Sequence, residues 1–282
     1  MPTHNYSEYA EYKGTTAGLC TSCGFWHLLS PKTDEYYESD QFYSLHAPPD
    51  WFVKEKREHD GGLWNACYDY QIGLLQKHLP MQFWNYRSFL DVGCGTGWFV
   101  QHAHKRGYAC QGVDPSNSAR AFLNLDCVFK TIPDVRYNAI RASLVLEHIP
   151  TPELELFNWR NHLYDNGLLM IIVPNDFSPL QKRLKTHHFI SPVHANYFQL
   201  DTLTNLLERC GFEVIHKGAT FPMELPLCLG YDYRGNDIKG RRVHNFRLRF
   251  EKLMGVRAFQ LYKRLFDWWG WGRELIFVAR KI

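Results

Sequence analysis

The chain has 282 residues, of which 45% are hydrophobic and 16% are aromatic, and its formal net charge is +3 at pH 7. This length and composition are sufficient for one α/β domain with additional elements and a substantial core. A nearly neutral charge argues against electrostatic capture of nucleic acid. The first residues lack the apolar segment of a secretion signal, and no stretch has the roughly 18 apolar residues of a membrane span. We therefore expect a cytoplasmic protein that binds neither nucleic acid nor membranes.

Strand and helix patterns alternate from about residue 85 onward. The predicted strands are "RSFLDVGC", "YACQGVD", "DCVFKTI", "YNAIRASLVLEHI", "LLMIIVP", "FEVIHKGAT" and "GRELIFVARK". The predicted helices between them include "GWFVQHAHKRG", "PSNSARAFLNL", "PELELFNWRNHLYDNG", which a glycine signal ends, and "LDTLTNLLERCG". Strands separated by helices at this rhythm predict a Rossmann-like α/β fold: a seven-stranded, mostly parallel sheet with helices on both faces.

Changes in sequence character divide the chain into four parts. Residues 1–80 form an N-terminal extension rich in aromatic residues, and residues 81–220 contain the core. Residues 221–272 are too long for a hairpin turn and have a helical pattern, so we expect a helical insertion that covers the acceptor site. Residues 273–282 are the last core strand.

The stretch "FLDVGCGTGWFV", residues 89–100, predicts a strand, a tight turn and a helix. The strand ends at Asp91, which places the glycines of the turn at the carboxyl edge of the sheet, where ligands bind in open α/β folds. Asp114 ends the next strand and could accept hydrogen bonds from both hydroxyls of a ribose. This geometry fits a nucleotide-type cofactor, although a plain strand, turn and helix is the alternative.

The cofactor is unlike a dinucleotide in two respects. A dinucleotide fingerprint requires glycine at position 98, which is Trp98 here. Asp91 also suits a ligand with a cationic amino group better than one with two phosphates. An NAD-dependent oxidoreductase is therefore the less favoured alternative.

The motifs "LDVGCGTG", "VDPS", "SLVLEHIP" and "GLLMIIVPND", in this order, resemble those of class I S-adenosylmethionine-dependent methyltransferases. The later "HANYFQLDTLTNLLERCGFEV" is similar to the subgroup with a His-x-Asn-Tyr-Phe segment before the last core helix. The resemblance implies that Asp91 and the glycine loop hold the methionine end of the cofactor, Asp114 the ribose, and Pro115 and Ser116 the adenine. The cofactor-binding residues that we expect are Asp91, Gly93, Cys94, Gly95, Gly97, Asp114, Pro115, Ser116, Leu144 and Leu146.

Methyl transfer to a hydroxyl requires removal of a proton, and histidine suits this task near neutral pH. His148 follows the fourth strand on the cofactor side, and His194 lies on a connection that should cover the pocket. Both are candidate catalytic bases, and a structural role is the alternative for each.

A small molecule is the expected acceptor, because "SLVLEHIP" stands where amino methyltransferases of nucleic acids have an Asn/Asp-Pro-Pro-aromatic motif. "FPMELPLCLGYDYRGN" resembles the tail of methyltransferases of sugar and cell-surface glycan assembly, which suggests a sugar, nucleotide-sugar or natural-product intermediate. Arg241 and Arg242 could bind an anionic acceptor, or they could simply form a solvated helix face. Asn175 and Tyr197 are further candidates for substrate binding. A non-catalytic, cofactor-binding regulatory protein is the alternative function.

Cys20 and Cys23 in "CTSCG" have the spacing of a zinc knuckle. Tetrahedral zinc needs two more ligands, and the next cysteine is Cys67, with His27 and His46 lying nearer in the sequence. Zinc binding and a metal-free turn both remain open at this point.

Overall fold

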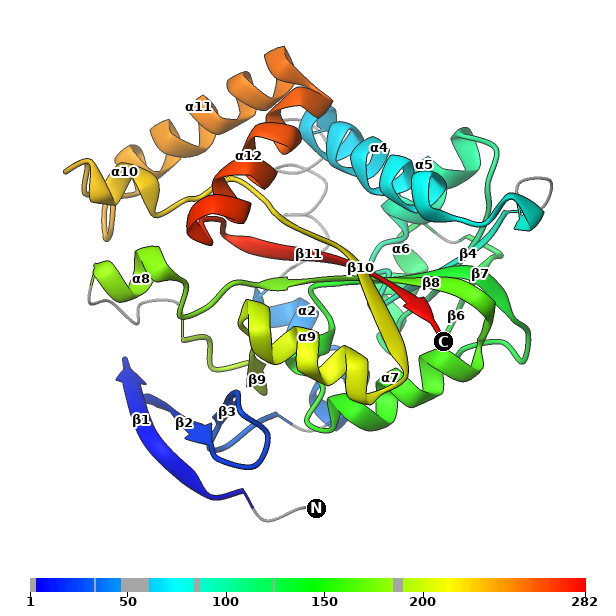
Figure 1. Ribbon diagram of the computed structural model, residues 1–282, viewed down its shortest axis with the longest axis horizontal. Coiled ribbons are helices and arrows are strands. Elements are labelled where there is room, and N and C mark those ends of the chain that lie inside the picture. The colour runs from blue at the N-terminus through cyan, green and yellow to red at the C-terminus, as the bar shows by residue number, and fades with distance from the viewer. Residues whose placement is uncertain (1–3, 33, 47–60, 84–86, 124, 185–189) are drawn as a thin grey trace.

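A seven-stranded sheet forms the centre of the computed structural model, which describes residues 4–32, 34–46, 61–83, 87–123, 125–184 and 190–282 (Figure 1). The strands lie in the order β10-β11-β8-β7-β4-β5-β6. Their bounds are β4 (Ser88–Val92), β5 (Ala109–Val113), β6 (Val128–Phe129), β7 (Tyr137–Ser143), β8 (Leu163–Pro174), β10 (Phe212–Ala219) and β11 (Glu274–Lys281). Strands β4 to β8 run parallel, and β11 lies antiparallel between β8 and β10. The predicted Rossmann-like sheet is confirmed.

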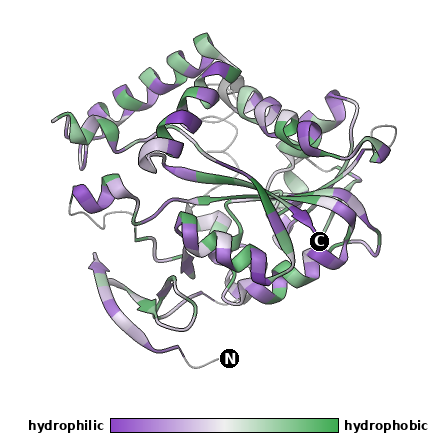
Figure 2. Ribbon diagram, in the orientation of Figure 1, coloured by the Kyte–Doolittle hydropathy of each residue, from purple (hydrophilic) through white to green (hydrophobic). Residues whose placement is uncertain are grey.

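Helices cover both faces of this sheet (Figure 1). Successive strand residues point to opposite faces, so Phe89 and Met170 pack on one side, whereas Leu90 and Ile171 pack on the other. The first face is covered by α4 (Gly61–His78), α5 (Trp98–Lys105) and α12 (Val256–Trp269). The second is covered by α7 (Pro152–Asn161) and α9 (Leu200–Arg209). The central strands are strongly hydrophobic, as expected for a sheet buried on both faces (Figure 2).

The N-terminal extension contains a small sheet of its own. Its strand order is β1-β2-β3-β9, with β1 (Tyr6–Tyr12), β2 (Thr15–Cys20), β3 (Trp26–Leu28) and β9 (Asn196–Tyr197). Strand β9 belongs to the core sequence, so it fastens the extension to the connection before α9. Trp26 stacks on Phe177 with 4.5 Å between ring centroids and adds an apolar contact at this junction. Two short helices follow, α1 (Asp34–Glu38) and α2 (Gln41–His46).

The helical insertion contains α10 (Leu225–Cys228), α11 (Asp237–Met254) and α12. Helix α12 buries Ala258, Phe259, Tyr262 and Phe266, whereas α11 buries only Val243 and Glu251 and packs against α4 and α12. Shorter elements complete the fold, namely α6 (Asn117–Leu123), α8 (Pro179–Arg183) and the 3-10 turns η2 (Met81–Phe83) and η3 (Leu146–His148). Among the helices of the described ranges, none is both long enough and apolar enough to cross a bilayer.

One helix boundary was predicted wrongly. The glycine signal at Gly167 was expected to end a helix, but α7 ends at Asn161 and β8 already begins at Leu163. Asn166 has a φ of 62°, and the pairing of β7 with β8 shifts register between Tyr137 and Ala139. Gly167 therefore lies at an irregularity within a strand, where the backbone approaches closely.

We predict that Gly167→Ala destabilises the protein. A Cβ at this position would lie 2.7 Å from the Tyr164 carbonyl oxygen, so the backbone must shift, at a cost of about 1–3 kcal/mol. Gly73→Ala is the matched control, because Gly73 lies in α4 with no atom within 4 Å of an added Cβ, and alanine there should stabilise the helix by about 1 kcal/mol. Urea unfolding of both variants measures the difference, and equal stability of the two would contradict this account of Gly167.

Candidate active site

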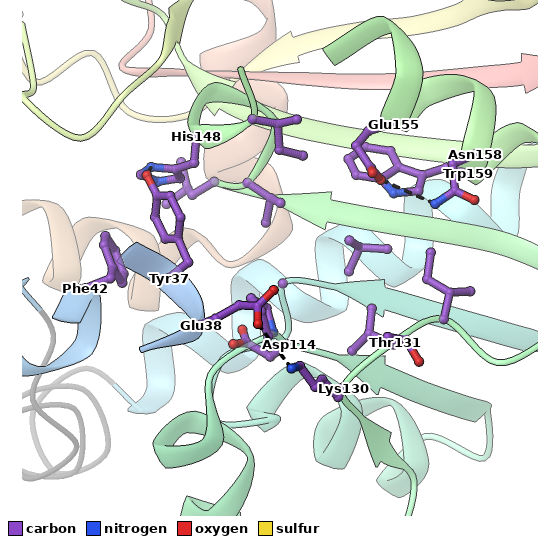
Figure 3. A pocket seen from close by; sticks show the side chains of 18 of the residues that line it. Tyr37, Glu38, Phe42, Asp114, Lys130, Thr131, His148, Glu155, Asn158 and Trp159 are labelled. Carbon is purple, nitrogen blue, oxygen red and sulfur yellow. Dashed lines mark hydrogen bonds and ion pairs between the residues drawn. The ribbon is translucent and has the colours of Figure 1, made fainter. Parts of the chain in front are cut away.

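A cavity of about 540 Å³ lies at the carboxyl ends of β4, β5 and β7 (Figure 3). His148, Tyr37 and Phe42 gather at one end, and Glu155, Asn158 and Trp159 lie at the other (Figure 3). Its lining residues are Tyr37, Glu38, Phe42, Tyr43, Val92, Gly93, Val113, Asp114, Pro115, Lys130, Thr131, Ile132, Leu144, Val145, His148, Ile149, Glu155, Asn158, Trp159 and His162. Five residues predicted from the sequence are among them: Gly93, Asp114, Pro115, Leu144 and His148.

The loop between β4 and α5 requires glycine for a steric reason. Gly93 has a φ of 62°, and a Cβ there would lie 2.3 Å from a methyl carbon of Val145. The Cys94 amide donates to the Val113 carbonyl at 3.0 Å, which ties the loop to the end of β5. The backbone is thereby exposed to the cavity without an intervening side chain, as a closely held ligand requires.

Asp114 organises the floor of the cavity. Its Oδ2 accepts hydrogen bonds from the Gly95 amide at 2.9 Å and the Tyr43 hydroxyl at 3.1 Å, and its Oδ1 accepts one from the Ser116 amide at 3.0 Å. Burial raises the pKa of Asp114, and these three donors act against that shift. The carboxylate thus connects the glycine loop with the start of α6.

Helices α1 and α2 lie across the cavity and were not predicted as part of the site. They contribute Tyr37, Glu38, Phe42 and Tyr43 to its lining. Asp40 accepts hydrogen bonds from the hydroxyl of Ser116 and the amide of Ser118, so this segment is fixed to α6. The aromatic richness of "DEYYESDQFYS" was the only sequence signal for this contribution.

Asp91 is almost fully buried and does not line the cavity. Its Oδ1 lies 2.5 Å from a guanidinium nitrogen of Arg141 in β7, whose Nε donates to Gln71 at 2.8 Å. Burial raises the pKa of Asp91, and the charge of Arg141 opposes that shift. Arg141 was missed because it stands within an apolar strand pattern. The pair joins two central strands directly beneath the glycine loop.

His148 occupies the cavity wall after β7. Its Nδ1 lies 2.9 Å from the Val193 carbonyl oxygen, which can only accept, so Nδ1 must be the donor. In the neutral ring this leaves Nε2 as the nitrogen that can take up a proton. The Tyr37 hydroxyl donates to the same carbonyl at 2.9 Å and packs beside the ring.

His194 lies next to His148 but behind the cavity lining. The two rings meet edge to face with centroids 5.0 Å apart. Nδ1 of His194 lies 3.8 Å from Oδ2 of Asp176, whose Oδ1 accepts a hydrogen bond from Arg273 at 3.0 Å. Although burial opposes it, His194 and Arg273 hold the pKa of Asp176 below its usual value, so this carboxylate is charged.

Glu147 is buried beside these two histidines, and neither of its oxygens has a hydrogen-bond partner among the described residues. Burial raises its pKa well above the usual range, because the charged form of the carboxyl group is poorly solvated there. Glu147 is therefore a poor candidate for a carboxylate ligand of a metal ion.

Another part of the cavity lining comes from residues without a recognisable motif. Lys130, Thr131 and Ile132 follow the short strand β6, and Lys130 forms an ion pair with Glu38 at 3.1 Å. Leu144 lines the cavity with a φ of 58°, an unusual conformation for leucine that is typical of functional sites.

Several predicted residues lie outside the cavity lining. Cys94, Gly95, Gly97 and Ser116 belong to its supporting loops, and Leu146 is fully buried in the main core. Asn175 donates to the Gly272 carbonyl at 3.0 Å, and Tyr197 donates to the Ser191 carbonyl at 2.7 Å. Arg241 and Arg242 lie on α11, which contributes no residue to this cavity. Cys20 and Cys23 lie in the N-terminal hairpin, which β2 and β3 form.

Comparison with known proteins agrees with this geometry. The family described as "Methyltransferase domain" matches residues 65–217. No curated protein sequence matches the chain.

Solved structures of methyltransferases share the fold. A SAM dependent methyltransferase from Archaeoglobus fulgidus is 19% identical, with 82% of this chain and 99% of that chain covered and a TM-score of 0.52. The plantazolicin methyltransferase BamL is 14% identical over 87% of this chain and 94% of its own, with a TM-score of 0.55. Phospholethanolamine N-methyltransferase 2 of Haemonchus contortus is 15% identical over 97% of this chain and 71% of its own, with a TM-score of 0.54. The chain therefore belongs to the methyltransferase domain family and has the fold of class I S-adenosylmethionine-dependent methyltransferases.

Proposed function

We propose that this methyltransferase transfers the methyl group of S-adenosylmethionine to an oxygen or nitrogen atom of a small molecule. The observation that carries this proposal is that Asp114, the glycine loop at Gly93 and His148 line one cavity. Ribose-binding and proton-accepting groups are thus within reach of one bound cofactor and one acceptor.

The residues present fit the cofactor. Gly93 lines the cavity with its backbone alone, since a Cβ there would collide with Val145, and the buried carboxylate of Asp114 suits a pair of ribose hydroxyls. Pro115, Lys130, Thr131 and Ile132 follow β5 and β6 and would border the adenine. Two similar structures, BamL and the Haemonchus contortus enzyme, are described as complexes with S-adenosylhomocysteine (SAH), which supports this assignment.

The roles of the chain's own groups follow from their positions. When bound, the cofactor supplies an activated methyl group on its sulfonium. His148 accepts the proton of the acceptor at Nε2, while the Val193 carbonyl fixes its tautomer through Nδ1. His194 packs edge to face against the His148 ring and is itself held beside the charged Asp176, so it orients the base.

The acceptor is proposed to enter at the end formed by Tyr37, Phe42 and His148, where two aromatic rings offer an apolar wall. The two similar structures named above contain a triazolic desmethylPZN analog and phosphomonomethylethanolamine, which supports a small molecule as acceptor. A sugar or nucleotide-sugar intermediate is one candidate for it. Binding of an anionic acceptor by Arg241 and Arg242 gains no support, because α11 lies outside the cavity.

A direct test measures S-adenosylhomocysteine formation from S-adenosylmethionine with a panel of small hydroxyl and amine acceptors. A thermal-shift comparison tests the cofactor independently of the acceptor. S-adenosylhomocysteine should stabilise the protein, whereas NAD should not. Stabilisation by NAD alone would overturn the proposal in favour of an oxidoreductase.

We predict opposite effects for two variants at the ribose site. Asp114→Ala should weaken S-adenosylhomocysteine binding about tenfold to a hundredfold, because hydrogen bonds to a charged group contribute about 1.5–3 kcal/mol. Tyr43→Phe should keep or tighten binding, because a carboxylate offers about four acceptor positions and three are already used by Gly95, Ser116 and Tyr43. Isothermal titration calorimetry measures both. Weaker binding to Tyr43→Phe would mean that this hydroxyl contacts the cofactor instead of competing with it.

The two histidines should separate in their kinetics. His148→Asn should lower kcat about a hundredfold to ten-thousandfold, the usual contribution of a general base, while S-adenosylhomocysteine affinity changes little. His194→Ala should also reduce turnover far more than cofactor affinity, but it should retain the pH dependence of kcat that His148→Asn abolishes. Unchanged activity of either variant would remove that histidine from the mechanism.

A further inference from the structure

The N-terminal hairpin brings two thiols and two imidazoles together, apart from the cavity. His4 precedes β1, Cys20 ends β2, Cys23 lies in the following turn, and His27 lies in β3. Nδ1 of His4 lies 3.4 Å from the Cys20 sulfur and 3.5 Å from the Cys23 sulfur. The four donor atoms all lie within 4.8 Å of one another. Two elements distant from His4 in sequence thus converge on it.

These distances suit a tetrahedral ion. Zinc binds sulfur at about 2.3 Å and imidazole nitrogen at about 2.0–2.1 Å, which places neighbouring ligand atoms of a tetrahedron about 3.3–3.8 Å apart. The two contacts of His4 fall in this range. Two thiolates with two imidazoles are also a ligand set that zinc occupies in structural sites.

Two further features support a ligand between these groups. His27 Nε2 is buried and has no hydrogen-bond partner among the described residues, and buried polar groups are rarely left in that state. The Cys23 amide donates to the Cys20 sulfur at 3.4 Å, so the turn already directs a backbone dipole at the sulfur, as it would toward a thiolate.

We propose that His4, Cys20, Cys23 and His27 bind a structural zinc ion. The site is closed by four protein ligands, so it leaves no position for a substrate. Its effect reaches the core through β3, because His27 pairs with Asn196 and Trp26 with Tyr197, two and three residues after His194. The ion would stabilise the small sheet that supports this segment. The inference does not depend on the proposed methyl transfer.

Elemental analysis of protein purified under reducing conditions without an affinity tag tests the proposal. One zinc ion per chain is expected, and Cys23→Ser and His27→Gln should each lose it. Cys127→Ser is the matched control, because this half-buried thiol lies outside the cluster, and it should retain the zinc. Wild-type protein without bound zinc, or zinc that persists in both ligand variants, would overturn the proposal.

Cobalt substitution keeps the test informative if a ligand variant fails to fold. Wild-type protein stripped by a chelator and titrated with Co²⁺ should show the intense visible bands of a tetrahedral ion and thiolate-to-metal charge transfer. Weak bands typical of six oxygen or nitrogen ligands would contradict the site. A Cys20–Cys23 disulfide found by mass spectrometry in native protein purified under reducing conditions would equally rule out the zinc site.

Discussion

The carboxylate of Asp114 is the contact on which the geometry of the site depends. It accepts hydrogen bonds from the glycine loop, from the start of the segment leading to α6 and from Tyr43 of α2. Three parts of the chain that are far apart in sequence therefore meet at one charged group. A charge buried to this degree is tolerated because donors surround it, and the same donors define where a ribose can approach.

Beneath this contact, the pair formed by Asp91 and Arg141 fixes the two central strands to each other. Removing one partner of a buried ion pair generally costs about 3–5 kcal/mol, because the other charge is left uncompensated. The guanidinium also stacks on Phe99 at 4.2 Å, which connects the pair to α5. The aspartate that resembles a cofactor ligand in the sequence thus supports the loop from below.

The core could be predicted from the sequence because its signals are local. Apolar runs such as "LLMIIVP", together with the turn glycines, identify the strands, and their order with the helices implies the parallel sheet. The cavity residues Gly93, Asp114 and His148 could be found because they lie beside recognisable motifs. Gly167 misled the prediction, since the same glycine can end a helix or permit a close backbone approach within a strand.

The remaining features depend on contacts between distant segments, which a single sequence does not reveal. The covering role of Tyr37 and Tyr43, the partner of Asp91 and the position of His4 beside Cys20 all arise from tertiary packing. Likewise, a basic run such as that around Arg241 does not distinguish an acceptor site from a solvated helix face, and α11 contributes no residue to the cavity lining and buries only Val243 and Glu251.

The pairing of Trp26 with Tyr197 has a consequence for biosynthesis. The ribosome releases the amino-terminal hairpin long before it makes the strand that completes the small sheet, so one edge of β3 must wait for its neighbour. Contacts of such sequence separation form late and slowly, and an open edge invites pairing with other nascent chains. The shortness of β3, which has three residues, limits how many hydrogen bonds a wrong partner can make along this edge.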